Sequence, residues 1–425
     1  MAATEKQPIT FAGPFNGVLT WLDARYPLMS TLKAHLTEYY APKNFNFWYY
    51  FGSLALLVFV LQIVTGIFLT MHYKPDANLA FASVEYIMRE VSWGWLIRYM
   101  HSTGASALFI CVYLHMFRGL LYGSYRKPRE LLWIVGMLIF LCLMGEAFFG
   151  YLLPWGQMSY WGAQVIVNLF AAVPLIGPDL AIWIRGDYVV SDATLNRFFA
   201  FHVIALPFVL AGLVAAHLLA LHEVGSNNPD GIEIKKNKDP KTGIPLDGIP
   251  FHPYYTVKDV FGVAVFMLVF AVIVFFAPEL GGYFLEYNNF IAADPLRTPQ
   301  HIAPVWYFTP YYSILRSFTA NFFWVDAKIW GVAAMGASAM IFFLLPWLDR
   351  SPAKSIRYRG PMFKTALAIF VVCFVILGYL GTQAVSEGRT LLAQVCTVLY
   401  FLFFLLMPWY STIDRCTPEP ERVTK

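Results

Sequence analysis

The stretch that decides the fold is Trp93–Tyr122, WGWLIRYMHSTGASALFICVYLHMFRGLLY. It is a long apolar run that carries two histidines, His101 and His115, with an arginine outside each of them. Titratable groups at membrane depth are costly and usually face a functional interior. At 3.6 residues per turn the fourteen-residue step is close to four turns, so both imidazoles share one helix face and stand about 21 Å apart along the axis.

A second apolar stretch offers a matching pair. Residues 195–223, LNRFFAFHVIALPFVLAGLVAAHLLALHE, hold His202 and His217, which are fifteen residues apart, still on one face and about 22 Å apart. Two such helices could clamp two flat ligands between them, one near each membrane surface, and two hemes fit that description. The alternative is that the four histidines are satisfied polar residues or a proton path.

Composition places the chain in a membrane. Of its 425 residues, 58% are hydrophobic and only 13% are charged, which is far too apolar for a soluble protein of this size. The five cysteines form no CxxC or CxxCH motif, which argues against iron–sulfur clusters and covalent heme in this chain. A net charge of +4 does not indicate nucleic acid, because basic residues beside spans follow from topology, and no nucleic-acid partner is expected.

The predicted fold class is all-α: a polytopic membrane protein with eight transmembrane helices and a diheme four-helix bundle in its N-terminal half. A hydrocarbon layer of about 30 Å requires about 20 apolar residues per span. The predicted spans are Trp48–Met71, Trp95–Leu121, Leu131–Leu153, Phe198–Leu221, Val260–Ala277, Ile329–Leu348, Ala366–Gly381 and Leu391–Trp409. They divide the chain into an N-terminal surface segment (1–47), the diheme bundle (48–222), a cytoplasmic loop (223–257), a C-terminal transmembrane domain (258–410) and a tail (411–425).

Basic residues gather in alternate loops, after spans two, four and six. The positive-inside rule makes these loops and both termini cytoplasmic, while the other loops, which carry several acids, are outer. The basic residues are Arg118, Arg126, Lys127 and Arg129, then Lys235, Lys236, Lys238 and Lys241, then Arg350, Lys354, Arg357, Arg359 and Lys364; the outer acids are Glu85, Asp179, Asp187, Glu279, Glu286 and Asp294.

This topology pairs the histidines. Spans two and four both run from outside to inside, so His101 lies outward with His202, and His115 lies inward with His217. We read no signal peptide at the N-terminus, and with the inside-positive loops this favours a bacterial inner membrane over a mitochondrial product.

Two pairs of glycines share the fourteen-residue step of the first histidine pair. Gly52 and Gly66 lie in span one, and Gly136 and Gly150 lie across span three. A missing Cβ lets a bulky planar group approach the backbone. The alternative is that these glycines only let helices pack closely, as small residues do in membrane bundles.

Five stretches carry a family resemblance: GWLIRYMHSTGAS (94–106), GYLLPWGQMSYWGAQV (150–165), LNRFFAFH (195–202), LHEVGSNNPDGI (221–232) and IPFHPYYTVKD (249–259). Together they resemble cytochrome b, the diheme quinol-oxidising subunit of the respiratory cytochrome bc complex, in the same order from about Phe45 to Trp409. The resemblance implies two non-covalent b-type hemes. The low-potential outer heme would be held by His101 and His202 and the high-potential inner heme by His115 and His217, with neutral imidazoles as axial ligands.

The resemblance also implies arginines near the heme propionates and two quinone sites on opposite faces. Arg98 and Arg118 match the arginines, although both could simply anchor the span ends. The outer ubiquinol site would take Phe148, Tyr151, Met158, Gly162, Pro304, Trp306 and Tyr307, the last three from the PVWY motif in the loop between spans five and six. The inner ubiquinone site would take His222, Ser226, Lys258 and Asp259, which otherwise resemble an end-of-helix histidine and interfacial charges.

The implied activity is that of a proton-translocating quinol:cytochrome c oxidoreductase, as the cytochrome b subunit of a multi-subunit complex. Quinol is oxidised at the outer site, electrons cross between the hemes, and quinone is reduced at the inner site. The implied partners are a Rieske iron–sulfur protein, a c-type cytochrome, a second copy of the complex, membrane lipids and quinone. The alternatives are a proton-coupled secondary transporter with intramembrane histidines, or another diheme quinone-linked cytochrome.

The sequence departs from the family pattern in two places. The second histidine pair is fifteen residues apart where relatives often have fourteen, and Pro207 between them could adjust the helix locally. The outer motif has Val305 where many members have glutamate. We expect Glu146, the one carboxylate within span three and about one turn from Tyr151, to accept the proton instead; the alternative is a helix-packing glutamate.

Overall fold

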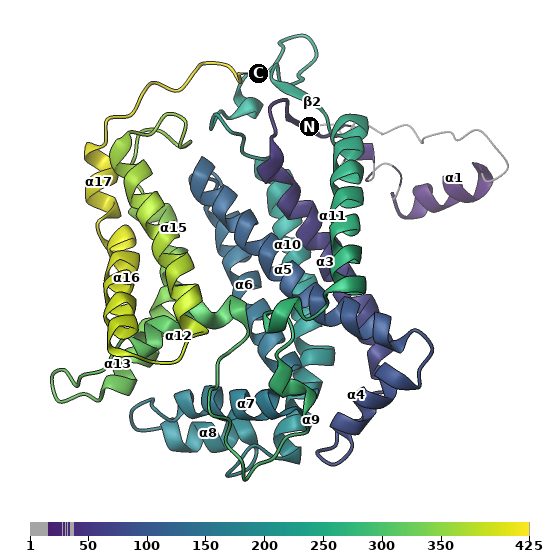
Figure 1. Cartoon of the computed structure of the whole chain (residues 1–425). Coiled ribbons are helices and arrows are strands. Elements are labelled where there is room, and N and C mark those ends of the chain that lie inside the picture. Colours follow the sequence, from purple (N-terminus) through teal and green to yellow (C-terminus); the bar gives the residue numbers. More distant parts are fainter. Residues whose placement is uncertain (1–15, 28, 30, 32, 35–37, 425) are drawn as a thin grey trace.

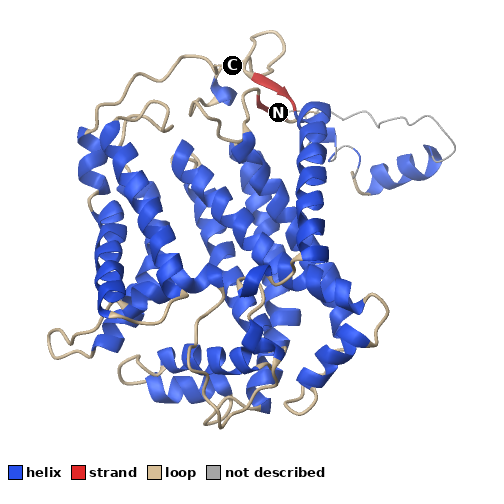
Figure 2. Ribbon diagram, in the orientation of Figure 1, coloured by secondary structure: helices blue, strands red, loops and turns tan. Residues whose placement is uncertain are grey.

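A computed structural model describes residues 16–424 except 28, 30, 32 and 35–37 (Figure 1). The described chain is mainly helical with very little strand, which confirms the predicted all-α class (Figure 2). Its strands form one short antiparallel pairing, in which β1 (Tyr40–Pro42) lies beside β2 (Gly248–Pro250) with Ala41 opposite Ile249.

The helices follow one another along the chain, with long connections before α3, α11 and α12. Their bounds are α1 Asn16–Arg25, α3 Tyr50–Thr70, α4 Ala80–Arg89, α5 Gly94–Tyr122, α6 Glu130–Leu152, α7 Gln157–Phe170, α8 Gly177–Arg185, α9 Asp192–Ala200, α10 Leu206–Val224, α11 Thr256–Phe276, α12 Thr309–Arg316, α13 Ala327–Met340, α14 Leu345–Leu348, α15 Pro361–Gly381, α16 Glu387–Leu405 and α17 Met407–Ile413.

Eight helical segments of the described chain are long and apolar enough to cross a membrane, which confirms the predicted number. Their order matches the prediction, but some bounds differ. The fifth is Phe251–Phe276 instead of Val260–Ala277, and the eighth is Glu387–Leu405 instead of Leu391–Trp409. The fourth is longer, Asp192–Val224 instead of Phe198–Leu221. The difference arises because a helix does not end where its apolar residues end. The polar start of this segment is held by a capping box between Ser191 and Thr194, which satisfies helix N–H groups outside the apolar run.

The N-terminal half is a bundle in which α3 packs on α5 and α6 packs on α10 (Figure 1). Helix α11 lies against α3 and α5 on the outside of this bundle. The C-terminal half is a second group of helices, where α12 packs on α13, α15 and α16. Buried aromatic rings fill its centre, including Phe370, Tyr400 and Phe404.

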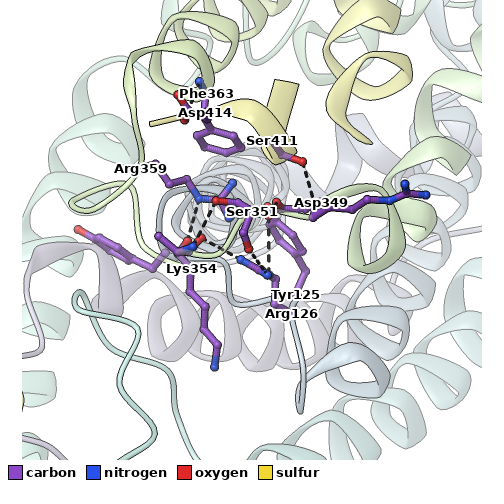
Figure 3. Close-up of polar contacts among 12 residues, drawn as sticks. Tyr125, Arg126, Asp349, Ser351, Lys354, Arg359, Phe363, Ser411 and Asp414 are labelled. Carbon is purple, nitrogen blue, oxygen red and sulfur yellow. Dashed lines mark hydrogen bonds and ion pairs between the residues drawn. The ribbon is translucent and has the colours of Figure 1, made fainter. Parts of the chain in front are cut away.

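The basic loops that follow α5, α10 and α14 meet at one end of the molecule. Arg129 and Lys354 both bind Glu233, and Arg126 donates to the carbonyl oxygen of Ser351. Figure 3 shows this end, where Arg359 pairs with the buried Asp349. Since the C-terminal ends of α5 and α10 lie together here, the two helices run in the same direction.

The opposite end is covered by short helices that lie across the bundle, namely α4, α7 and α8 (Figure 1). The loop between α11 and α12 folds back over this end, where the carbonyl oxygen of Ile291 accepts the N–H of Gln157 at 2.8 Å. The outer histidine pair and its cavity lie between this cover and the centre of the bundle.

Candidate heme and quinone sites

The four histidines of α5, the π-turn before α10, and α10 meet as two pairs. The ring centroids of His101 and His202 are 6.1 Å apart, and those of His115 and His217 are 6.3 Å apart. A metal ion bonded to one nitrogen of each ring at about 2 Å would leave the ring centroids about 6 Å apart. The pairing is the one predicted from topology, and each pair has the separation that bis-histidine ligation of iron requires.

The fifteen-residue step between His202 and His217 is absorbed by a local change in the helix. Residues Phe201–Ala205 form a π-helical turn, in which the N–H of Leu206 donates to the carbonyl oxygen of Phe201 five residues earlier. Pro207 lies two residues after the end of this turn and has no N–H to continue the ordinary pattern. A π-turn takes up one extra residue. The two histidines therefore share one helix face, as they would with a fourteen-residue step in a regular helix.

Each of the four period-fourteen glycines faces one of the four histidines. A Cβ added at Gly52 would lie 3.2 Å from His115, and one at Gly66 would lie 3.3 Å from His101. On α6 the approach is closer. A Cβ added at Gly136 would lie 3.1 Å from His217, and one added at Gly150 would lie 2.4 Å from His202. These glycines therefore let the histidine rings approach the helix backbone, and the room that they would leave for a heme stays a prediction.

The second ring nitrogens of the outer pair have partners that fix the rings. Nδ1 of His101 lies 2.9 Å from the hydroxyl of Thr65 on α3. Nδ1 of His202 lies 2.9 Å from the main-chain oxygen of Glu146 and 2.9 Å from its carboxylate Oε1. A partner on Nδ1 orients the ring and leaves Nε2 to a ligand.

Two half-buried arginines lie near the histidine pairs. Arg98 contacts the sulfur of Met88 at 3.9 Å and the ring of Phe290, and Arg118 lies 3.2 Å from Nδ1 of His115. Neither forms an ion pair with a carboxylate among residues of the described chain, and Nε of Arg118 is buried without a hydrogen-bond partner. Buried guanidinium groups without a counter-ion suit the propionates of a heme.

A large, mainly apolar cavity surrounds the outer histidine pair. Its wall includes Gly66, Gly150 and Arg98, and it continues past the histidines to Tyr151, Val305 and Tyr307. The structure thus places both predicted outer-site tyrosines, Tyr151 and Tyr307, in the same cavity as the outer histidine pair.

The other predicted outer-site residues lie around this region in different ways. Pro304 and Trp306 line a second cavity next to the first. Gly162 on α7 faces Tyr151, where an added Cβ would be 3.8 Å from the ring. Met158 is fully buried, and Phe148 packs against Phe198, so neither lines these two cavities.

Tyr151 is hydrogen-bonded to the carboxylate of Glu286, a residue that the sequence did not single out as part of the outer site. The hydroxyl of Tyr151 donates to Oε2 of Glu286 at 3.2 Å, across 135 residues of chain. In the sequence Glu286 was one of several outer acids in a loop, and no motif separated it from the others. Glu146, the expected candidate, lines the large cavity but has the outer histidine as its neighbour.

The predicted inner-site residues lie at the other end of the bundle, around the N-terminal segment. The ring of Tyr39 lies 4.7 Å from that of His222, and its hydroxyl lies 3.3 Å from Oγ of Ser226. Lys258 lies over the ring of Tyr255, and Asp259 interacts with Ser53 of α3. Tyr39 was not predicted, because it belongs to the predicted surface segment and carries no motif.

Comparisons with known proteins agree with this arrangement. A family model described as cytochrome b/b6/petB matches residues 36–225, and one described as cytochrome b(C-terminal)/b6/petD matches residues 292–401.

Relatives match over nearly the whole chain. Cytochrome b of Allochromatium vinosum is 65% identical over 96% of this chain and 98% of its own length. Cytochrome b of Rickettsia prowazekii is 48% identical over 96% of this chain and 97% of its own length. A solved structure, the hyperthermophilic respiratory Complex III, is similar with a TM-score of 0.84 and 40% identity over 93% of this chain and 99% of that one. By both family models and both relatives, this chain belongs to the cytochrome b family.

Proposed function

We propose that this chain is the cytochrome b subunit of a quinol:cytochrome c oxidoreductase, with the residue roles given below. As a multi-pass cytochrome b, it carries two b-type hemes and takes part in quinol oxidation and electron transfer. The observation that carries the residue assignment is the meeting of two histidine pairs, 6.1 and 6.3 Å between ring centroids, on two helices that run in the same direction.

The histidines and glycines would hold the two hemes. His101 and His202 would ligate the outer iron, and His115 and His217 the inner one, while Gly52, Gly66, Gly136 and Gly150 keep the helix surfaces open beside the histidine rings. Arg98 and Arg118 would neutralise propionates. The hemes supply one-electron transfer across the membrane, and the protein fixes their spacing and surroundings.

The outer site would bind quinol where the large cavity reaches Tyr151 and Tyr307. Stacking of Tyr307 on Phe109, with ring centroids 4.0 Å apart, fixes the wall of this site. Pro304 and Trp306 continue it, with Phe148, Met158 and Gly162 supporting it from α6 and α7. An apolar cavity with a few polar groups suits a quinol ring with two hydroxyl groups.

The inner site would bind quinone and protonate it on reduction. His222 and Ser226 lie at the end of α10, Lys258 and Asp259 lie at the start of α11, and the N-terminal segment lies against both. Histidine, lysine and carboxylate side chains can hydrogen-bond the quinone oxygens and deliver protons.

The partner proteins, the membrane and the orientation of the chain in it are part of the same proposal. Because the five cysteines form no cluster or covalent-heme motif, a Rieske iron–sulfur protein and a c-type cytochrome would complete the electron path, in a dimeric complex with ubiquinone as substrate. The membrane would be a bacterial inner membrane. The end where the three basic loops meet would face the cytoplasm, as would both termini.

A proton-coupled transporter is not favoured, since the histidines lie as two separated pairs with their rings opposed instead of as a connected relay. The test is a reduced-minus-oxidised spectrum of the purified protein with a potential titration. Two b-type components that titrate separately are expected. The absence of heme absorbance would overturn the proposal.

A further inference from the structure

A second cavity lies beside the outer histidine cavity and has different chemistry. Polar side chains line it, including Glu286, His301, Thr382 and Gln383. Tyr151, Phe284 and Val305 line both cavities, so these three residues form the wall between them. Tyr151 is the hydroxyl-bearing residue of this wall, and therefore the group that can pass a proton from one cavity to the other.

Glu286 is the carboxylate of the polar cavity. It accepts the hydroxyl of Tyr151 at 3.2 Å, and it forms no ion pair with a lysine or arginine of the described residues. Burial raises the pKa of Glu286 to about 7, and the Tyr151 hydrogen bond opposes this rise only in part. A carboxyl group poised near the working pH can take up a proton and release it again.

The other titratable groups around Glu286 come from three elements. Tyr151 belongs to α6, Tyr283 to the same loop as Glu286, and His301 to the segment before α12. Nε2 of His301 lies 3.1 Å from the main-chain oxygen of Thr382, which also lines the cavity. The cavity therefore holds acceptor and donor groups beyond Glu286.

Among the described residues, no carboxylate that lines the quinol cavity is hydrogen-bonded to Tyr151. Val305 is apolar, and the carboxylate of Glu146, which does line that cavity, lies 2.9 Å from Nδ1 of the outer histidine His202. Glu286 is thus the carboxylate that a hydroxyl group at the site can reach through Tyr151.

We propose that Glu286 accepts the proton of quinol bound at the outer site, through the hydroxyl of Tyr151, and releases it into the polar cavity toward the outer side. This inference rests on the proposed outer quinol site. It assigns to Glu286 the part that the sequence suggested for Glu146.

The step balances as follows. The quinol O–H bond breaks as its proton passes to the oxygen of Tyr151, while the original hydroxyl proton of Tyr151 passes to Glu286. Tyr151 stays neutral and Glu286 becomes a neutral carboxylic acid, which then loses its proton to water in the polar cavity. The two electrons leave singly, one to the outer heme and one to an external iron–sulfur carrier, and the second proton follows the same path.

The test uses the complete complex in membranes and compares the wild type with Glu286→Gln. Quinol-driven reduction of the external cytochrome should fall at least tenfold at pH 8. In the wild type the rate should rise as pH increases through about 7, because the ionised carboxylate is the acceptor, and the variant should lack this inflection. Both heme spectra should be unchanged. Adding Val305→Glu to the variant should restore part of the rate, since it returns a carboxylate to the dividing wall.

Glu279→Gln is the matched control, because Glu279 lies in the same loop but outside the polar cavity, and it should keep the wild-type rate and pH profile. A wild-type rate and profile in Glu286→Gln would overturn the inference, as would a loss of rate that comes with a loss of heme. If the glutamine variant does not assemble, Glu286→Asp is measured in its place. An inflection of the pH–rate profile that moves to another pH supports the inference, and one that stays at the wild-type pH overturns it. A wild-type complex that oxidises no quinol would instead overturn the proposed function.

Discussion

Nδ1 of His202 lies 2.9 Å from the carboxylate Oε1 of Glu146, and also 2.9 Å from the main-chain oxygen of the same residue. One residue of α6 thus holds the outer histidine with two oxygens, one of them on an acidic side chain. The other carboxylate oxygen of Glu146, Oε2, is buried and has no hydrogen-bond partner among the described residues. Glu146 therefore contacts the histidine, whereas Glu286 accepts a hydrogen bond from Tyr151.

This contact predicts an effect of Glu146→Gln on the outer heme. A carboxylate beside an axial imidazole stabilises the more positive, ferric iron, so its removal should raise the midpoint potential. The expected rise is about 30–60 mV, which is up to a tenfold change in a one-electron equilibrium. Potentiometric titration of the heme absorbance measures it. The inner heme is the internal control, and an unshifted outer potential would contradict the role.

The glycine–histidine distances predict a graded loss of heme. A Cβ at Gly150 would lie 2.4 Å from His202, which cannot be accommodated without movement, so Gly150→Ala should remove the outer heme absorbance. Gly66→Ala should lose less of it, because its Cβ would be 3.3 Å from His101 and the ring would need to move by only a few tenths of an ångström. Gly212→Ala on α10 is the control, since nothing lies within 4 Å of its Cβ. Equal heme content in the Gly150 and Gly66 variants would refute the assignment.

The pairing of the histidines predicts which spectral component each substitution removes. His101→Ala and His202→Ala should each abolish the outer component, whereas His115→Ala and His217→Ala should each abolish the inner one. A reduced-minus-oxidised spectrum of each variant separates the two. If His101→Ala and His217→Ala removed the same component, the pairing would be wrong.

The buried pair of Arg359 and Asp349 predicts a large effect on stability (Figure 3). Burial alone would raise the pKa of Asp349, but Arg359 and Arg126 hold it below its usual value. Arg359→Leu leaves a buried carboxylate without its main partner, which costs about 3–5 kcal/mol. The midpoint of thermal heme loss in detergent should fall clearly, whereas Arg350→Leu, at an exposed neighbour, should leave it unchanged.

The same ion pair sets the sign of the pH dependence. A carboxyl whose pKa is lowered in the folded state contributes stability that is fully present above its unfolded pKa of about 4. This contribution is lost as the pH falls through the lowered folded value. The difference in thermal midpoint between wild type and Arg359→Leu should therefore be largest at neutral pH. It should narrow as the pH falls, first through the pKa of Asp349 in the variant, which burial raises, and then through the lowered pKa in the wild type.

The sequence by itself determined the features that repeat along a single helix. Apolar length predicted eight spans, and helical period placed His101 and His115 on one face, because both depend on local geometry that is the same in any helix. The alternation of basic loops predicted parallel spans and hence the histidine pairing. The motifs then identified the family, which the comparisons confirmed.

Only the tertiary structure decided where local periodicity fails or where distant segments meet. The fifteen-residue step needed the π-turn at Phe201–Ala205, whose hydrogen bonds cannot be read from spacing. Tyr39 reaches His222 and Glu286 reaches Tyr151 through loops and termini that carry no period. Such contacts are set by how the elements pack, so the nearest carboxylate in the sequence, Glu146, was not the one bonded to Tyr151.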